Sequence, residues 1–139
     1  MENRRNVMIA MGAAFAAGAA PLRGASVPND VRGFPDAEEI KHPFGVQHIH
    51  FRGETDQLKV LEAGSLLLNA GQTPHPPHKH PEEELMVVAE GSCEISIEGK
   101  ITKCEAGATM YCAAEHLHDI VNTGDKPMLF YYTKWLTRG

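Results

Sequence analysis

The chain has 139 residues, of which 42% are hydrophobic and 22% are charged, and its formal net charge is −5 at pH 7. This length predicts one domain with a real core, and the composition is typical of globular rather than disordered proteins. Nucleic-acid binding is excluded as the main function, because it depends on neutralising phosphates and this acidic chain has no basic run.

The first 25 residues, MENRRNVMIAMGAAFAAGAAPLRGA, differ from the rest of the chain. Adjacent arginines at positions 4 and 5 precede a moderately apolar stretch, and Ala17 and Ala19 supply the small residues of a cleavage site. The arginine pair resembles a twin-arginine signal, which exports folded proteins, and an ordinary secretory signal is the alternative. We expect residues 1–19 to be removed, which leaves a periplasmic or secreted protein with no membrane-spanning segment.

Residues 20–44 are predicted to form an extended N-terminal arm or linker. The text SVPNDVRGFPDAEEIKHPF, residues 26–44, is rich in proline, glycine and charge. At most one turn of helix is expected there, from Asp36 to Ile40. The domain itself is expected to cover residues 45–139.

Beyond the arm, short β-like runs follow one another closely and are separated by turn signals such as EAGS, NAGQTPHPP, IEGK and NTGDKP. Many short strands, glycine-rich turns and no long helical period favour an antiparallel sandwich or barrel. The predicted strands are 46–51, 58–62, 65–68, 85–89, 92–98, 100–103, 109–112, 119–122 and 128–135.

One predicted hairpin can be placed in register. A two-residue turn at 98–99 puts Cys93 directly across from Cys104. The same register pairs Glu94 with Lys103 on the outer face. We interpret the two cysteines as small buried hydrophobic residues, and a disulfide in an oxidising compartment is the alternative.

The stretch HPPHKHPEEELMVVAEG, residues 75–91, gathers three histidines and three glutamates before an apolar run. His78 and His80 are two apart, so in an extended segment both imidazoles leave the backbone on the same side. Glu84 begins the next strand, and its side chain is in phase with the interior residues of that strand. On spacing alone, Glu82 or Glu83 could be the carboxylate ligand instead. Burying these groups is costly unless a divalent metal pairs them.

A second polar patch, AAEHLHDIVN, supplies a further histidine, His118, just before another predicted strand. With this patch the chain resembles a small single-domain cupin. The family's first motif, which contains His-x-His, a glutamate and a final glycine, is similar to residues 78–84 and Gly91. Its opening glycine corresponds to Gly71, which lies one position further from the histidines than the pattern asks.

The second cupin motif is matched by Gly107, His118 and Asn122. Ala113 and Glu115 stand where the family usually has a proline and a second glycine. These departures bear on the shape of the loop before His118 and not on the ligand set, because every metal-binding position of the pattern is filled.

The resemblance implies an all-β fold, an antiparallel jelly-roll barrel. It also implies one divalent transition metal (Mn, Fe, Ni, Co or Zn), and the ligands carried over are His78, His80, Glu84 and His118. Candidates for a catalytic acid or base near the barrel mouth are His75, Glu115 and His116. Loop residues without a chemical role are the alternative for these three.

An open metal site of this kind predicts an enzyme that acts on an oxygen-rich small molecule, as a dioxygenase or as an isomerase or lyase. The alternative is a module that holds a metal or a small ligand without turnover. A homodimer through sheet edges and the arm is expected, because it would protect edge strands. We interpret His42, His48 and His50 as surface residues and the aromatic residues of the last strand as packing.

Overall fold

The computed structural model describes residues 26–139, so the predicted export signal, residues 1–19, lies outside the described residues. Among residues 26–139, no helix has the length and apolar character needed to span a membrane. The elements are one short 3-10 turn, η2 (Phe34–Asp36), and the strands β1 (Glu38–His42), β2 (Gly45–Gly53), β3 (Leu58–Leu68), β4 (Glu83–Glu90), β5 (Ser92–Ile97), β6 (Lys100–Glu105), β7 (Thr109–Cys112), β8 (His118–Val121) and β9 (Met128–Thr137).

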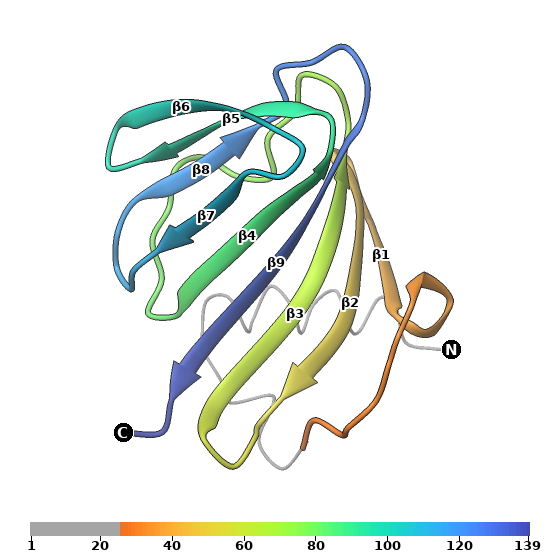
Figure 1. Cartoon of the computed structure of the whole chain (residues 1–139), viewed down its shortest axis with the longest axis vertical. Helices are drawn as coiled ribbons and strands as arrows, with labels where there is room; N and C mark the ends of the chain where they lie inside the picture. Colours follow the sequence, from red (N-terminus) through yellow and green to blue (C-terminus); the bar gives the residue numbers. More distant parts are fainter. Residues whose placement is uncertain (1–25) are drawn as a thin grey trace.

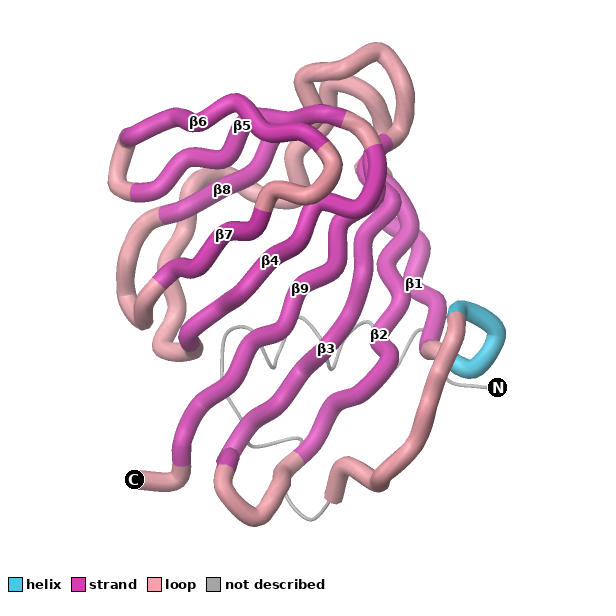
Figure 2. The backbone as a smooth tube through the Cα atoms, viewed as in Figure 1, coloured by secondary structure: helices cyan, strands magenta, loops and turns pink. Residues whose placement is uncertain are grey.

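The strands form two sheets. Six of them make one sheet in the order β1-β2-β3-β9-β4-β7, and three make a second in the order β6-β5-β8. Every pairing between neighbouring strands is antiparallel. Figure 1 shows the small sheet beside β7 and β4, and Figure 2 shows how little of the described chain is helical. The predicted all-β jelly-roll barrel is therefore confirmed.

The hydrophobic core lies between the inner faces of the two sheets. Strand β9 shows the pattern: Met128, Phe130 and Tyr132 are buried, whereas Tyr131 between them is exposed. This alternation follows from the period of two in an extended strand. The small sheet contributes side chains such as Ile95 to the same cluster, so one core serves both sheets.

The turn predicted at EAGS is wrong, because β3 runs without a break from Leu58 to Leu68. Gly64, which lies within the EAGS stretch, instead allows the Tyr132 side chain and the His48 backbone to approach β3 closely. A Cβ at this position would lie 2.6 Å from the hydroxyl oxygen of Tyr132 and 2.7 Å from the carbonyl oxygen of His48. The glycine therefore lets β3 pass beside the Tyr132 side chain and does not mark a turn.

The arm carries more structure than its sequence predicts. The turn of helix expected from Asp36 to Ile40 is instead the 3-10 turn η2 followed by strand β1, which pairs along β2. Ile40 is 2% exposed and packs on Ile49 of β2. This buried contact explains why a segment rich in charge joins the sheet.

The predicted hairpin register is confirmed: Cys93 lies across from Cys104, and Glu94 lies across from Lys103. Both cysteines are free thiols in the structure. Burial, together with the neighbouring Cys104, raises the pKa of Cys93 to about 12. The Cys93 thiol is therefore uncharged at neutral pH and packs as a small apolar side chain.

Gly91, the last glycine of the first motif, connects β4 to β5 with a φ of 91°. An added Cβ would lie 2.7 Å from the Cβ of Met128, which is fully buried. We expect Gly91→Ala to lower the free energy of unfolding by about 2–5 kcal/mol, since the left-handed backbone costs about 1–2 and overpacking about 1–3. Urea denaturation measures the loss.

Gly99→Ala is the matched control for this substitution. Gly99 has a φ of 83°, but no atom lies within 4 Å of the added Cβ. Only the backbone cost of about 1–2 kcal/mol should appear. Equal losses in the two variants would mean that contact with Met128 has no part in the requirement for glycine at position 91.

Candidate metal centre

Two segments far apart in the sequence are joined by backbone hydrogen bonds. The N–H of His78 donates to the carbonyl of His118 at 3.1 Å, and the N–H of His118 donates to the carbonyl of His78 at 2.9 Å. The N–H of Glu115 donates to the carbonyl of His80 at 2.8 Å. The first histidine segment thus lies against the start of β8, and this pairing brings the two motifs together.

The imidazoles of His78, His80 and His118 form a tight group. Their ring centroids are 5.1 Å apart between His78 and His80, 4.8 Å between His78 and His118, and 4.9 Å between His80 and His118. One ring nitrogen from each residue lies within 4.8 Å of the other two. Because imidazole nitrogen is a common ligand of transition metals, these three residues could hold a metal ion.

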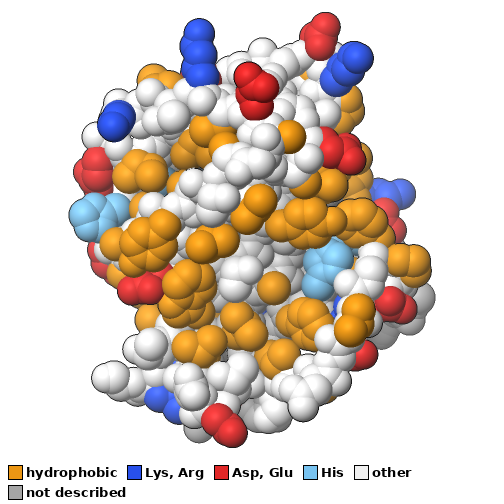
Figure 3. Space-filling model, viewed as in Figure 1, with side chains coloured by type: hydrophobic (Ala, Val, Ile, Leu, Met, Phe, Trp, Pro, Cys, Tyr) orange, Lys and Arg blue, Asp and Glu red, His pale blue; other side chains and the backbone are white. Residues whose placement is uncertain are grey.

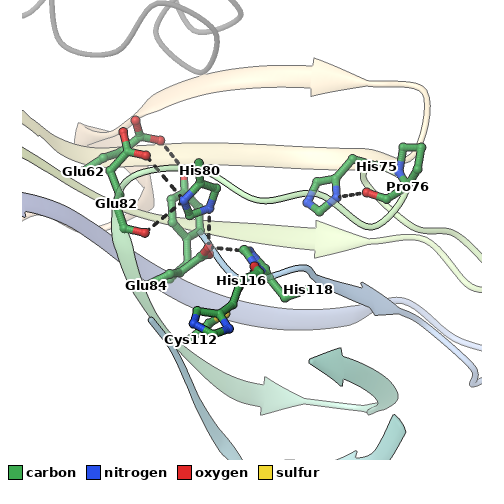
Figure 4. Close-up of polar contacts among 10 residues, drawn as sticks. Glu62, His75, Pro76, His80, Glu82, Glu84, Cys112, His116 and His118 are labelled. Carbon is green, nitrogen blue, oxygen red and sulfur yellow. Dashed lines mark hydrogen bonds and ion pairs between the residues drawn. The ribbon is translucent and has the colours of Figure 1, made fainter. Parts of the chain in front are cut away.

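Glu84 lies beside His80 and His118, as Figure 4 shows, and we call these three residues together with His78 the metal group. Its Oε1 is 3.1 Å from Nε2 of His80 and 3.1 Å from Nε2 of His118. Burial alone would raise the pKa of Glu84, but hydrogen bonds from the two imidazoles, together with the charge of Lys134, lower this pKa to about 2. The carboxylate is therefore ionised and faces the same point as the histidines.

Backbone oxygens hold the outer nitrogens of two of these rings. Nδ1 of His80 donates to the carbonyl of Glu82 at 3.1 Å, and Nδ1 of His118 donates to the carbonyl of His116 at 2.9 Å. Because a carbonyl can only accept, each Nδ1 carries a hydrogen and each Nε2 is left to face Glu84. A hydrogen bond of this kind fixes the ring orientation and tautomer of metal-binding histidines in proteins.

The histidines differ in protonation. Burial, with the neighbouring imidazoles of His75 and His118, lowers the pKa of His78 to about 3. For His118, burial alone would lower the pKa, but hydrogen bonds to Glu84 and to the carbonyl of His116 raise it above its usual value of 6.5. His78 is therefore ready to bind a metal at neutral pH, whereas at His118 protons compete with a metal up to a higher pH than at an ordinary histidine.

His78, His80 and Glu84 of the metal group line a cavity of about 120 Å³. By the same measure a single water molecule needs only about 10–15 Å³, so the cavity has room for a small organic molecule. Its apolar lining is Phe44, Leu66, Pro74, Met86, Ile120 and Phe130. Its polar lining outside the metal group is His42, Gln47, His75, Tyr132 and Lys134.

Of the three candidates for a catalytic acid or base, only His75 lines the cavity. Its ring stacks on the ring of His78, with centroids 3.5 Å apart. Its Nδ1 donates to the carbonyl of Pro76 at 2.8 Å. His75 thus lines the cavity beside the metal group.

Glu115 and His116 do not line the cavity, and their side chains are exposed. Nδ1 of His116 pairs with Glu98 at 3.3 Å. Glu115 has a φ of 63°, the left-handed conformation that favours the glycine usual at this place in the cupin pattern. Only the backbone of this loop reaches the site, through the hydrogen bonds to His80 and His118.

We expect His116→Ala to leave the affinity for a metal within about twofold of the native value. An exposed side chain away from the site changes free energies by only about 0.5 kcal/mol, and the carbonyl that binds His118 is kept. Competition with a coloured zinc chelator measures the affinity. A tenfold loss would show that the His116 side chain reaches the metal.

Sequence reasoning missed most of the polar wall of the cavity. The sequence indicates a surface position for His42 and a packing role for Tyr132, whereas the structure places both in the cavity wall. The alternation along β9 indicates that Tyr132 and Lys134 face the inside of the barrel, because both are in phase with the apolar residue Phe130. His42 had no such signal, since its position depends on the unexpected strand β1.

His48 and His50 lie outside the cavity lining. Their rings pack beside Phe34 of the arm, with centroids 4.8 Å and 5.7 Å from the Phe34 ring. Residues at odd and even positions of β2 face opposite sides of the sheet, which separates this pair from Gln47. The two histidines therefore do not belong to the metal group.

Comparison with known proteins agrees with this architecture. The cupin domain family model matches residues 64–134. An RmlC-like cupin from Shewanella frigidimarina superposes with a TM-score of 0.67 at 16% identity, and the match covers 81% of this chain and 95% of that one. KdgF from Halomonas sp. gives a TM-score of 0.59 at 17% identity, over 80% and 93% of the two chains.

A third solved structure, the cupin domain of Cnp3 from Schizosaccharomyces pombe, superposes with a TM-score of 0.61 at 13% identity, over 76% of this chain and 73% of that one. No curated protein matches the chain in sequence. At these identities the solved structures show a shared fold and carry no argument about activity.

Proposed function

The chain belongs to the cupin domain family, and from that premise we propose that it binds one divalent transition metal and acts on an oxygen-rich small molecule. The proposed ligands are His78, His80, His118 and Glu84. The observation that carries the proposal is the convergence of three imidazoles and an ionised carboxylate beside a cavity that two of these imidazoles and the carboxylate line. Three nitrogen donors and one oxygen donor suit Mn, Fe, Co, Ni or Zn better than Ca or Mg.

A divalent ion held by these four protein ligands would still have room for a substrate that chelates through two oxygens. When bound, the metal would supply Lewis acidity, which makes such a substrate more acidic and stabilises negative charge on its oxygens. The protein contributes the apolar side of the cavity, including Met86 and Phe130, which keeps water away from the rest of the molecule. An α-hydroxy acid, an enediol or a catechol fits this description.

The polar lining supports an enzyme rather than a module that only holds a ligand. A binding module needs no acid or base beside its ligand, whereas His42, His75 and Lys134 all line this cavity. Proton transfer would give an isomerase or a lyase with any of the divalent metals. A dioxygenase would additionally require iron and O2.

Elemental analysis of protein purified from its native compartment is the first test, with Glu84→Ala as the comparison. One transition-metal ion per chain in the native protein and a lower content in the variant are expected. The metal-loaded protein is then incubated with hydroxy acids and catechols, in air and under strict anaerobiosis. Anaerobic turnover supports an isomerase or lyase, and oxygen consumption supports a dioxygenase. Native protein with no transition metal contradicts the proposal.

We also propose that the protein is exported, on the evidence of its N-terminal sequence alone. Sequencing of the mature N-terminus should find a start near residue 20. Replacing both arginines of the pair by lysine should make the uncut precursor accumulate, because twin-arginine export depends on them. Export that survives this change but stops when the apolar stretch is interrupted would indicate an ordinary secretory signal.

The homodimer likewise stays a proposal. Its support is the gathering of exposed apolar side chains on one face of the molecule, seen in Figure 3. The exposed large apolar residues on the strands of the six-stranded sheet are Leu67, Leu85, Tyr111 and Tyr131. Contiguous apolar surface on a protein of this size is typical of a contact with another protein.

A further inference from the structure

A continuous chain of hydrogen bonds crosses four adjacent strands on the inner face of the large sheet. The hydroxyl of Tyr132 on β9 donates to Oε2 of Glu62 on β3 at 2.7 Å. Nε2 of Gln47 on β2 donates to the hydroxyl oxygen of Tyr132 at 2.7 Å. Oε1 of Gln47 lies 2.8 Å from Nε2 of His42, the last residue of β1. The chain therefore connects a buried carboxylate to an imidazole at the cavity.

The direction of this chain follows from the donors available. A phenol has one hydrogen, and since that hydrogen goes to Glu62, the Tyr132 oxygen must accept from Gln47. The Gln47 amide is thereby oriented with its oxygen toward His42. An amide oxygen can only accept, so Nε2 of His42 carries a hydrogen. In the neutral ring, the lone pair is then on Nδ1.

Burial makes this arrangement rigid. Glu62, Gln47 and Tyr132 are 3%, 7% and 8% exposed, so little water competes for their hydrogen bonds. The ring of His42 stacks on Phe44, with centroids 4.6 Å apart and planes 9° from parallel. Nδ1 of His42 makes no hydrogen bond with any residue from 26 to 139, and the residue lines the same cavity as the metal group.

We propose that His42 is the proton acceptor of this cavity and that Gln47, Tyr132 and Glu62 position it. The inference rests on the proposed function, because its substrate is a chelating molecule bound beside the metal group. An acidic C–H or O–H of that molecule gives its proton to Nδ1 of His42, and the electron pair stays on the substrate. Return of the proton to another substrate atom completes an isomerisation and restores the neutral ring.

The chain stabilises the charge that this step creates. The imidazolium of His42 donates through Nε2 to a series of hydrogen bonds that ends in the carboxylate of Glu62. His75 is the other imidazole of the lining outside the metal group, and within residues 26–139 its ring makes one hydrogen bond, to the carbonyl of Pro76. The substrate class is thus narrowed to molecules with an acidic hydrogen next to chelating oxygens, such as α-hydroxy ketones and α-hydroxy acids.

The first test uses metal-free protein, so it does not depend on the metal site. Long-range ¹H–¹⁵N NMR of the imidazoles, at a pH where His42 is neutral, should find the hydrogen on Nε2 and none on Nδ1. The Nε2–H signal should be protected from exchange with water, because Gln47 accepts it. A hydrogen on Nδ1 of His42 would overturn the proposal.

Two variants test the positioning residues. In Gln47→Met the protected Nε2–H signal of His42 should disappear, because its acceptor is lost. Tyr132→Phe should weaken the protection, whereas Tyr131→Phe, its outward-facing neighbour on β9, should leave the signal unchanged. A His42 signal indifferent to both Gln47→Met and Tyr132→Phe would overturn the proposal. Should Gln47→Met fail to fold, the two tyrosine variants decide.

The second test counts protons when acetohydroxamic acid, which loses a proton as it chelates through two oxygens, binds the zinc-loaded protein. Calorimetry in buffers of different ionisation enthalpy should show that the native protein releases about one proton fewer than His42→Phe, because His42 keeps it. Equal release overturns the role of His42 and leaves the metal site standing. If the zinc-loaded protein does not bind acetohydroxamic acid, the proposed role of His42 is also overturned. If the protein does not bind zinc, the proposed function is overturned instead.

Discussion

Replacing His118 by alanine is expected to weaken zinc or nickel binding by at least about a hundredfold, more than the roughly 10–100-fold that loss of an outer-shell partner causes. The substitution removes one of the three imidazoles whose nitrogens lie within 4.8 Å of one another. It also removes one of the two imidazoles that hold the Glu84 carboxylate. Competition with a chelator of known affinity, followed by elemental analysis, measures the change.

His48→Ala is the matched control for this prediction. His48 is also a histidine on a strand of the barrel, but its ring packs beside Phe34 and does not line the cavity. Its substitution should leave both affinity and metal content unchanged. A His118→Ala protein that still carries one tightly held metal ion per chain would place the metal site elsewhere.

The parts of this site that sequence predicts are those governed by local geometry. His78 and His80 share a side because side chains two apart in an extended segment point the same way, and both lie close to His118 in the metal group. Glu84 faces them because it is in phase with the buried Met86 of β4. The hairpin register at Cys93 follows from a two-residue turn.

The parts that sequence does not predict depend on contacts between distant segments. Gly64 reads as a turn signal, yet it lies within a strand because the Tyr132 side chain passes against it. Strand β1 is held on β2 by the buried contact between Ile40 and Ile49. The pairing of β1 with β2 is what brings His42 to the cavity. A composition rich in proline and charge carries no information about such a partner.

The loop before His118 shows a third limit. A chain position that needs a left-handed backbone is usually occupied by glycine, and here Glu115 adopts a φ of 63° without one. The sequence makes Glu115 and His116 candidates for a catalytic acid or base, but the side chain of His116 pairs with Glu98 at the surface. What the loop gives the site is a carbonyl oxygen for Nδ1 of His118, and every residue type has one.

Metal affinity is expected to fall by at least about tenfold per pH unit once the pH drops below the pKa of His118. A metal needs the lone pair on Nε2, and in the protonated ring this nitrogen holds the hydrogen that is donated to Glu84. Because hydrogen bonds to Glu84 and to the carbonyl of His116 outweigh burial and raise the pKa of His118, protons compete from a higher pH than at an ordinary histidine. His78, with its pKa lowered to about 3, and Glu84, with its pKa lowered to about 2, join the competition only in much stronger acid.

Zinc titrations at a series of pH values, in buffers that do not bind zinc, measure this dependence, and the protons released on binding are counted in the same experiment. Release should approach one from His118 on the acid side of its pKa and decline as the pH rises through that pKa, because the ring is then already neutral. His116→Ala should keep the same profile, since its exposed ring does not touch Nε2 of His118. An affinity that does not change across the weakly acidic range would mean that His118 is not a ligand, because a coordinating Nε2 cannot also hold its proton.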